Sequence, residues 1–588
     1  MGAVEVLVAR ADALAGGGAL AEACDVYRVA LDRDPRHGPA LAGLGRALLG
    51  RGAPASAACV LRLAAAAAPE RLDVTADLAL ALARSGDAAG ALAVALEMPP
   101  TAGVLGFRAE RLEELGRRDE ALAGLTAARL LHPHEAALHR CHAVLARRAG
   151  QNDVAAAAWR ALLAVDSGDA RAWSSLGGVL EALGEENEAR EAMRVALALD
   201  PSLADSLYNW AHVLIGRDQL EEALPWSRRA ARLAPACGYI QTNLGVCLLG
   251  LGRVDAAVAA HRRAVALDPG DAEAAYDLAW ALLTAGDWGA GWRFHEARWR
   301  LARFTSPRPP LPMPAWDGRP LPGNATLFLH AEQGLGDALM MARLIAPARA
   351  RARARRVVVE CPAPLARVMG AVEGVDEVLA RGAPVPPADA HLPLMSLPHR
   401  LGVTLDVLPG AVPWIHLPGE QPPAPAALPV PDALRVGLVW AGSPDNAMDR
   451  WRSCPAGALG PLLAVPGIHW VNLQLGPRAR DLPGLPPALA EGGDLAETAR
   501  TLATLDLVVG VDTAVIHLAG ALGRPAWVLL AFAADFRWLR AGETSPWYPS
   551  LRLFRQTSRG DWPGLIDQVA ETLAAARHAR LEQGREMW

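Results

Sequence analysis

The chain has 588 residues, of which 52% are hydrophobic, and its formal net charge is -5 at pH 7. This length is sufficient for several domains, and the hydrophobic share is ample for burying their cores. Because basic and acidic residues are interspersed, the composition argues against a nucleic-acid-binding protein and against one that binds membrane surfaces.

The cysteines and the apolar runs bear on where such a protein resides. The seven cysteines form no CxxC pair, so we interpret them as small buried residues in a reducing compartment, not as a zinc site or a disulfide framework. No run of about 18 uncharged apolar residues occurs, as a membrane span requires. The first residues also lack the apolar core of a signal peptide. We therefore expect a cytoplasmic protein with no membrane span.

A marker residue, usually proline, recurs through the first half of the chain. All but one of the gaps between successive markers are 34 residues, and the exception, from Pro69 to Pro99, is 30. A period of 34 residues with a helix-ending proline is typical of the tetratricopeptide repeat, a helix–turn–helix unit that stacks into a solenoid. The markers are Pro35, Pro69, Pro99, Pro133, Ser167, Pro201, Pro235 and Pro269.

Small residues recur in phase with these markers. Glycine or alanine lies ten residues after each marker, and alanine lies twelve residues before each marker except Pro99. Two antiparallel helices can approach closely only where the side chains between them are small. We therefore predict a superhelix of repeats over residues 1–300, with the second helix of the short repeat reduced by about one turn. Its last helix, at 288–300, carries bulky aromatic residues, which we expect to dock on the part that follows.

The second half of the chain has a different pattern. Residues 301–325 are rich in proline and are predicted to be a linker. Short apolar runs then alternate with helix-like stretches, which is typical of parallel α/β sheets. A second proline-rich segment, 418–432, separates an N-terminal lobe at 326–417 from a C-terminal lobe at 433–588 that ends in a helix. We expect two Rossmann-like lobes that face each other across a cleft. The runs lie at 326–330, 357–361, 435–440, 470–474, 507–511 and 527–530.

The first of three candidate clusters is EQGLGD at 332–337, directly after the first predicted strand. Gly334 and Gly336 permit a tight turn, and Asp337 then opens a helix at the carboxyl end of a strand, where α/β sheets bind ligands. Asp337 has an alternative interpretation as a plain helix N-cap. No Lys-Ser/Thr pair follows, so the turn is not a phosphate loop.

The second cluster follows the strand that opens the C-terminal lobe. Gly442 and Ser443 would let the backbone approach a phosphate, and Arg450 and Arg452 could neutralise its charge. The alternative is a surface turn with solvated arginines.

The third cluster begins where the predicted strand at 507–511 ends. Asp512 and Thr513 open a helix, and the free N–H groups of that helix start, together with the Thr513 hydroxyl, would form an anion site. His517 lies one turn further on the same face. It is either a ligand-side residue or a packed histidine.

Together these clusters resemble the heptosyltransferase-type glycosyltransferases of family 9, which have a GT-B fold, in the branch fused to tetratricopeptide repeats. The resemblance covers about residues 316 to 562, and the string that begins at Asp512 is its most specific element. The motifs that carry it are EQGLGD (332–337), GLVWAGSP (437–444), DRWRS (449–453), VDTAVIHLAGALGRPAWVLL (511–530) and SPWYP (545–549).

The resemblance implies a role for each matched residue. Asp337 would be the base that takes the proton from the acceptor hydroxyl. The helix start at Asp512 would hold the phosphates of the donor. The glycines of the turns at 334–336 and 442 would leave space for the donor. The basic residue that balances the leaving group is commonly lysine in the family and is Arg450 or Arg452 here. The implied donor-binding set is Gly334, Gly336, Gly442, Ser443, Arg450, Arg452, Asp512, Thr513, Ala514 and His517.

The chemistry so implied needs no cofactor beyond a nucleotide-sugar donor. Helix N–H groups and an arginine can stabilise the departing phosphate, and no DxD-like pair of carboxylates occurs in a suitable loop, so we expect a metal-independent reaction. A base opposite the leaving group predicts inversion at the anomeric carbon. The sugar, the nucleotide and the oligomeric state stay open.

The repeats predict the kind of acceptor. Eight residues after the later markers lie Ser175, Asn209, Asn243 and Asp277, at a position that resembles the peptide-gripping asparagine ladder of O-linked N-acetylglucosamine transferase. An ordinary hydrated groove is the alternative. A protein-binding groove fused to a transferase predicts sugar transfer to Ser/Thr of a protein, with flagellin as the first candidate. The alternatives are a transferase for cell-surface glycan or lipopolysaccharide and a non-catalytic scaffold.

Overall fold

The computed structural model describes residues 2–306, 310–417, 433–444, 446, 449–489 and 493–583. The chain forms two compact units, Met1–Arg217 and Asp218–Trp588. The boundary between them falls inside the run of repeats, so the second unit contains the last repeats together with both α/β lobes. The predicted interlobe linker at 418–432 lies outside the described residues.

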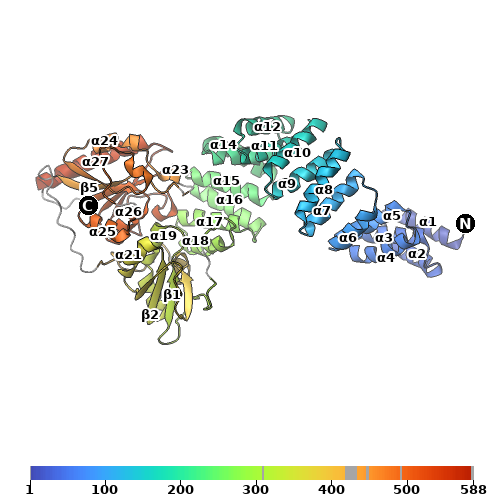
Figure 1. The fold of residues 1–588 in the computed structure, drawn as a ribbon, viewed down its shortest axis with the longest axis horizontal. Helices are drawn as coiled ribbons and strands as arrows, with labels where there is room; N and C mark the ends of the chain where they lie inside the picture. Colours follow the sequence, from blue (N-terminus) through green and yellow to red (C-terminus); the bar gives the residue numbers. More distant parts are fainter. Residues whose placement is uncertain are drawn as a thin grey trace. The chain divides into compact units, whose positions relative to one another are not determined.

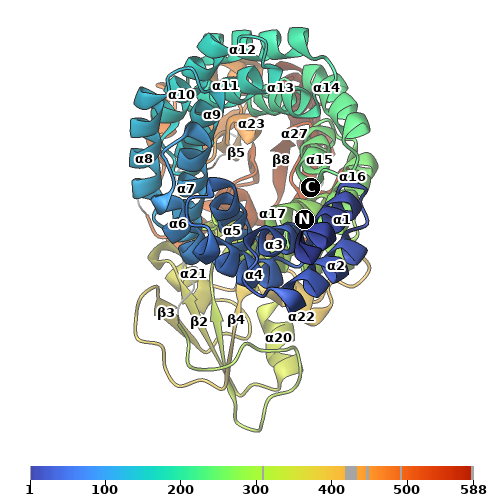
Figure 2. The same cartoon turned by 90° about the vertical axis from the view of Figure 1, so that its right-hand side faces the viewer.

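The first unit consists of antiparallel helix pairs (Figure 1). The second helix of each pair is 14 residues long, except for α6, which has 10 residues and confirms the shortened repeat. Figure 2 shows the pairs stacked one after another along this unit. The helices are α1 (Ala3–Gly16), α2 (Leu20–Arg33), α3 (Gly38–Gly50), α4 (Pro54–Ala67), α5 (Leu72–Arg84), α6 (Ala88–Glu97), α7 (Ala102–Glu114), α8 (Arg118–Leu131), α9 (Ala136–Arg148), α10 (Asn152–Val165), α11 (Ala170–Ala182), α12 (Glu186–Leu199) and α13 (Ala204–Gly216).

The small residues of the repeats lie where the helices touch. A Cβ added to Gly45 of α3 would lie 2.4 Å from Cγ of Leu61 of α4, and one added to Gly177 of α11 would lie 2.7 Å from Cγ of Met193 of α12. The turns within the pairs are equally regular, since residues with a positive φ recur with the period of the markers. These residues are Gly18, Gly52, Gly86, Gly116, Gly150, Gly184, Asp218, Gly252 and Gly286.

The second unit begins with the last helix pairs and continues into the lobes. Trp288 and Trp292 of α18 are buried in the same hydrophobic core as the strands of both lobes, as the bulky last helix predicted. Trp288 stacks on Trp547, with 5.2 Å between the ring centroids. The elements are α14 (Leu220–Leu233), α15 (Gly238–Gly250), α16 (Val254–Leu267), α17 (Ala272–Ala285), α18 (Trp288–His295) and the short 3-10 helix η1 (Glu296–Arg300).

The N-terminal lobe has a four-stranded parallel sheet in the order β3-β2-β1-β4. Figure 2 shows β2, β3 and β4 in this sheet, in which β1 lies between β2 and β4. The sequence pattern missed β3 and β4 because both are short and neither is a continuous apolar run. The elements are β1 (Thr326–His330), α19 (Leu335–Ala342), α20 (Ile345–Ala352), β2 (Arg356–Cys361), η2 (Ala363–Leu365), α21 (Ala366–Gly370), β3 (Glu377–Ala380), β4 (Ala390–Pro393), η3 (Leu394–Ser396) and α22 (Leu397–Leu401).

The C-terminal lobe has a five-stranded parallel sheet in the order β6-β5-β7-β8-β9. Strand β9 was also missed, because its arginines interrupt the apolar run. The elements are β5 (Leu434–Val439), α23 (Asp449–Arg452), η4 (Ala456–Leu459), α24 (Gly460–Leu463), β6 (Ile468–Asn472), η5 (Pro477–Arg480), α25 (Leu495–Ala503), β7 (Leu507–Val511), α26 (Ala514–Ala521), β8 (Ala526–Leu530), η6 (Phe536–Trp538), β9 (Leu551–Arg555) and α27 (Trp562–Gln583).

The strand orders locate the ligand-binding edges of both sheets. The chain order reverses between β1 and β4 in the first sheet and between β5 and β7 in the second. Parallel α/β sheets bind ligands beyond the carboxyl ends of the strands at such reversals. The three candidate clusters follow β1, β5 and β7, so all of them lie at these edges.

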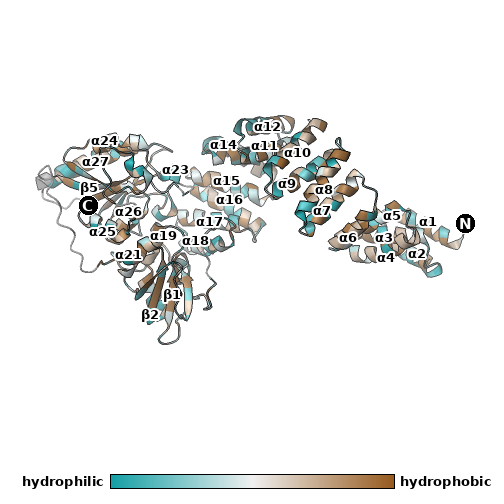
Figure 3. Ribbon diagram, viewed as in Figure 1, coloured by the Kyte–Doolittle hydropathy of each residue, from teal (hydrophilic) through white to brown (hydrophobic). Residues whose placement is uncertain are grey.

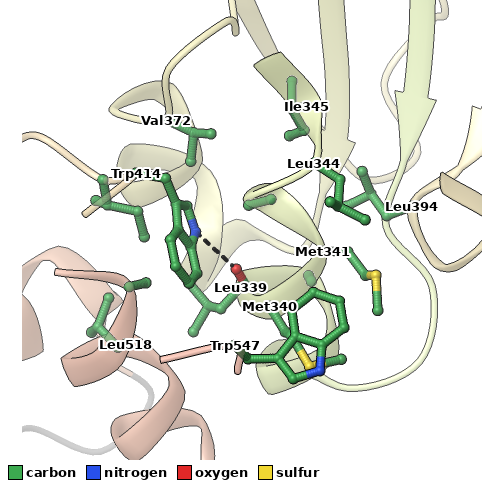
Figure 4. Packing of buried hydrophobic residues seen from close by; sticks show 14 of the residues in the cluster. Leu339, Met340, Met341, Leu344, Ile345, Val372, Leu394, Trp414, Leu518 and Trp547 are labelled. Carbon is green, nitrogen blue, oxygen red and sulfur yellow. Dashed lines mark hydrogen bonds between the residues drawn. The ribbon is translucent and has the colours of Figure 1, made fainter. Parts of the chain in front are cut away.

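The two lobes share one hydrophobic core around α19 and α26, which pack against each other. Figure 4 shows Trp414 and Trp547 lying against α19, with Leu518 of α26 nearby. Trp414 donates its Nε1–H to the carbonyl oxygen of Leu339 over 3.2 Å. Hydropathy colouring shows apolar residues along β1 and β2 of the N-terminal lobe (Figure 3). Burial of this kind stabilises the contact between the lobes.

Candidate active site

Asp337 lies in the first turn of α19, where its carboxylate has two partners. Its Oδ2 accepts the backbone N–H of Gly334 over 2.9 Å, and its Oδ1 accepts an ion-paired hydrogen bond from Arg537. Gln333, the residue before Gly334, has a φ of 59°, which is an uncommon conformation for a residue other than glycine. Asp337 is therefore not the N-cap itself. It caps the helix from within and also reaches across to the other lobe.

Arg537, in η6, is the residue at this site that the sequence analysis did not find. Its guanidinium is buried and pairs with Asp337 and, over 2.6 Å, with Asp535. Burial lowers the pKa of Arg537, but the carboxylates of Asp337, Asp535 and Asp512 outweigh that effect and raise it, so the guanidinium stays charged. Burial also raises the pKa of Asp535. No motif surrounds Arg537, so only its position after β8 at the same sheet edge could have indicated it.

The start of α26 carries an unused polar group. Thr513 is the N-cap, and the residue is only 8% exposed. Within the described residues its Oγ1 has no hydrogen-bond partner. A buried hydroxyl beside free helix N–H groups is a suitable place for an anion, because both the dipole and the donors favour negative charge.

His517 packs against the residues around this helix start. Its Nε2 donates to Asp512 over 3.2 Å, its Nδ1 accepts the hydroxyl of Tyr548 over 2.7 Å, and its ring stacks on Trp538. Burial would raise the pKa of Asp512, but the His517 hydrogen bond and the nearby positive charge lower it, which keeps Asp512 ionised. Both ring nitrogens of His517 have partners within the chain, which favours the interpretation of His517 as a packed residue that holds Asp512.

The turn after β5 is held by side chains from two neighbouring segments. The N–H groups of Trp440 and Ala441 donate to Oε1 of Gln474 over 3.0 and 2.8 Å. The N–H of Gly442 donates to Oγ of Ser453 over 3.0 Å. The backbone at this edge is therefore fixed before any ligand arrives.

The structure distinguishes the two arginines that the sequence left open. A Cβ added to Gly442 would lie 2.5 Å from Nη2 of Arg452, so this guanidinium lies directly on the turn. Arg450 is exposed and lies over the ring of Trp451, 4.0 Å from the ring centroid. Arg452 is also 3.6 Å from Asp449. Arg452 is therefore the arginine whose guanidinium contacts the Gly442 turn.

The clusters of the two lobes meet at one place. β5 and β7 are neighbours, with Val439 opposite Gly510, so the turn at Gly442 and the start of α26 lie side by side. Across the lobes, a Cβ added to Gly336 would lie 2.7 Å from Cδ2 of His517. Together with the Arg537–Asp337 pair, these contacts place Asp337 next to the candidate anion site.

Gly336 provides a test of this close approach. We expect Gly336→Ala to destabilise the protein by about 1–3 kcal/mol. The hydrogen bonds of His517 to Asp512 and Tyr548 hold its ring in place, so the ring cannot move away from the added methyl group without losing them. Gly289, in the first turn of α18, has open space where a Cβ would lie, so Gly289→Ala should not destabilise the same unit. The measurement is the free energy of chemical unfolding of the two variants. Equal values would show that the lobes do not pack closely here.

A cavity of about 200 Å³ lies beyond the carboxyl end of β6. Gln474, Gly476, Arg480 and Pro487 are among the residues that line it. Because Gln474 also holds the turn after β5, this cavity is adjacent to the candidate phosphate site.

The last repeat contacts the same region. Trp280 of α17 meets Phe536 of η6 edge to face, with 5.2 Å between the ring centroids. The same end of the repeats also forms a buried ion-pair cluster. Arg298 of η1, which is fully buried, contacts Glu332 over 2.7 Å and Glu296 over 2.8 Å. Arg298 therefore ties the end of the repeats to the EQGLGD loop, a link that no sequence motif indicated.

The residues of the predicted asparagine ladder have partners inside the repeats. Ser175 and Asn209 lie in the first unit, where Asn209 donates its amide to Oγ of Ser174 over 2.8 Å. In the second unit, the nearly buried Asn243 accepts the hydroxyl of Ser227 over 3.3 Å. A bound peptide would have to replace these bonds, so the structure favours the hydrated groove over a free ladder at these two asparagines.

For Asp277, the fourth residue of that set, we predict that it makes the stability of the protein depend on pH. Burial raises its pKa to about 7, and Arg303, 3.9 Å away, only partly opposes this shift. Since the pKa is raised above the unfolded value, the stability that Asp277 contributes is complete below about pH 4 and is lost as the pH rises through 7. Between pH 5 and 8 the wild type should therefore lose about 2–3 kcal/mol more stability than Asp277→Asn. Unfolding measured at both pH values checks this, and equal losses would contradict it.

Two features are absent from the described part of the chain. No helix among them has the length and apolar character that crossing a bilayer demands. No group of three or more His, Cys, Asp or Glu side chains among them could hold a metal ion.

Comparison with known families agrees with this geometry. Residues 142–204, 208–272 and 248–290 match the tetratricopeptide repeat model, and residues 482–577 match the model of glycosyltransferase family 9 (heptosyltransferase). The matches thus place tetratricopeptide repeats in the first half of the chain and a similarity to glycosyltransferase family 9 in the C-terminal lobe. The match to family 9 includes β7, α26 and η6, the elements that carry Thr513, His517 and Arg537.

Individual proteins are similar to parts of the chain. Protein FlbA of Caulobacter vibrioides is 30% identical over 335 residues, which cover 50% of this chain and 53% of FlbA. The chain thus spans about half the length of this curated relative. Among solved structures, the yeast Tom70 is 14% identical with a TM-score of 0.33 and covers 50% of this chain and 84% of its own. YrrB, described as a TPR protein with an unusual peptide-binding site, is 24% identical with a TM-score of 0.24, covering 29% and 89%.

Proposed function

We propose that this protein is a glycosyltransferase that moves a sugar from a nucleotide-sugar donor to a Ser or Thr hydroxyl of a protein bound by the repeats. The observation that carries the proposal is that Asp337 of one lobe pairs with Arg537 of the other, while the neighbouring Gly336 lies against His517 of α26. At the start of that helix, the Thr513 hydroxyl has no partner among the described residues. These contacts occur in a chain whose C-terminal lobe matches glycosyltransferase family 9.

The donor would lie on the C-terminal lobe. Its phosphates would accept hydrogen bonds from the first N–H groups of α26, including that of Ala514, from Thr513 Oγ1 and from Arg452 on the Gly442 turn. The exposed Ser443 lies at the outer end of this turn. The cavity of about 200 Å³ beyond β6 would take the nucleoside. These groups stabilise the negative charge that develops on the leaving phosphate, and they are fixed in advance by Gln474 and His517.

The acceptor hydroxyl would come from the side of the N-terminal lobe. Asp337 would accept its proton as the oxygen attacks the anomeric carbon, and the bond from that carbon to the donor phosphate would break. Since the base and the leaving group belong to opposite lobes, the attack would be in line and would invert the anomeric centre. Arg537 would have to release Asp337 for this step, and the arriving phosphate is the anion that can attract its guanidinium.

A protein acceptor is proposed because the repeats reach the site directly. The last repeat packs on η6 through Trp280 and on the EQGLGD loop through Arg298. A chain held by the repeats would therefore be close to Asp337. Flagellin is the first candidate, because bacterial transferases with the arrangement that this chain resembles include enzymes that glycosylate flagellin.

Intact-mass analysis of flagellin, produced with and without this protein in cells that make activated sugars, tests the proposal. A mass increase by whole sugar units that depends on this protein is expected. Unchanged flagellin together with acceptor-independent donor hydrolysis would point to a glycan acceptor instead. Absence of both donor hydrolysis and donor binding would leave a non-catalytic scaffold and overturn the proposal.

A further inference from the structure

A second cavity, of about 490 Å³, lies between α14, α15 and α16 of the second unit. Three arginines line it: Arg228 and Arg232 from α14, and Arg263 from α16. Pro225 and Leu244 add apolar surface, and the buried Gln241 lies among the lining residues. We call this feature the arginine pocket.

No ion pair among the described residues neutralises the charge of the arginine pocket. Arg228, Arg232 and Arg263 are exposed, and none of them has an ion pair with another described residue. Their neighbour Arg262 on α16, in contrast, is 3.6 Å from Asp287. Like charges gathered around one concavity repel each other and attract an anionic ligand.

The spacing of the arginines indicates the form of that ligand. Arg228 and Arg232 are four residues apart on one helix, so they project from the same face about 6 Å apart. Side chains two residues apart in an extended chain have nearly the same separation, about 6.6 Å. Arginine binds carboxylates through its planar fork, and the apolar part of the lining suits the methylene groups and backbone of a peptide better than a free phosphate.

We propose that the arginine pocket binds an extended acidic segment of a protein partner, with carboxylates at alternate positions. The helices that carry the pocket are attached to the C-terminal lobe: Arg559 donates to the carbonyl oxygen of Gly250 over 3.0 Å, and Arg540 pairs with Asp255 over 3.0 Å. A segment held in the pocket is thereby tethered to the family 9 domain. The inference rests on the proposed function only where it takes this partner to be the acceptor.

The test is the binding of a fluorescein-labelled peptide of alternating glutamate and serine to the full chain, followed by anisotropy in the absence of any donor. The pocket variant replaces Arg228, Arg232 and Arg263 with glutamine. The control variant replaces the same number of arginines on or beside the same helices, namely Arg229, Arg253 and Arg262, which do not line the pocket. A peptide of alternating glutamine and serine, and inorganic phosphate as a competitor, complete the set.

We expect the pocket variant to lose at least tenfold in affinity and the control variant less than threefold, with no binding of the neutral peptide. Equal losses in both variants would show general electrostatic attraction and overturn the proposal, as would failure of the wild type to bind. Full displacement by millimolar phosphate would show a small-anion site instead. Because no donor is present, these results are independent of whether sugar transfer is observed.

Discussion

Asp337→Asn should reduce sugar transfer by roughly 10²–10⁴-fold, the range for loss of a general base. Asparagine has nearly the same shape, and its oxygen can still accept the N–H of Gly334 that Asp337 accepts. It cannot accept a proton from the acceptor hydroxyl. The fold and the donor affinity should therefore persist while transfer is lost. Single-turnover transfer and calorimetric donor titration measure the two quantities separately.

Asp376 provides a matched control for this variant. It lies in the same lobe and, like Asp337, accepts one backbone N–H, from Val357 over 2.7 Å, and one arginine, Arg349, over 3.1 Å. Asp376→Asn removes an arginine-paired carboxylate away from the site, so transfer should be unchanged. If Asp337→Asn retained wild-type turnover, or if both variants lost activity equally, Asp337 would not be the base.

Arg298→Met should destabilise the protein by about 3–5 kcal/mol, the typical cost of removing one partner of a buried ion pair. Arg298 has no exposed surface, and it neutralises Glu332, whose side chain is 1% exposed, and Glu296. Burial raises the pKa of Glu332 even with Arg298 in place. Without the guanidinium, Glu332 must take up a proton or leave its site, and either change disturbs the loop that holds Asp337.

Arg303 supplies the comparison for Arg298. It pairs with Glu273 over 2.5 Å, but its side chain is 60% exposed. Pairs of this kind contribute about 0–1 kcal/mol. Urea unfolding of Arg298→Met and Arg303→Met should therefore differ by several kcal/mol. Similar small effects would mean that the buried cluster does not hold the last repeat on the N-terminal lobe.

The repeats could be predicted almost completely because their signals are local and periodic. Small residues such as Gly45 and Gly177 occur where one helix must approach its partner, and the marker residues recur where helices end. The parallel sheets were also predictable, since buried strands are apolar runs. Short strands at sheet edges, such as β3 and β9, carry charged residues and give no such run.

The site was predictable only where it follows a strand end. The loops that carry Asp337, Gly442 and Thr513 come directly after β1, β5 and β7. Parallel topology brings the ends of β5 and β7 together, and the packing of α19 on α26 adds the end of β1. Arg537 and Arg298 owe their importance to contacts across the fold, with Asp337 and Glu332 respectively, and nothing in their local sequence indicates those partners. For the same reason the sequence could not decide between the two interpretations of His517, because its contact with Tyr548 joins distant segments of the chain.

A crystal structure of this protein with a bound nucleoside diphosphate tests the central claim most directly. We expect the phosphates to lie at the start of α26, within hydrogen-bond distance of Thr513 Oγ1 and Arg452, with the open side of the terminal phosphate facing Asp337. A nucleotide bound elsewhere, or an Asp337 carboxylate turned away from that phosphate, would contradict the claim that both lobes contribute to one transfer site.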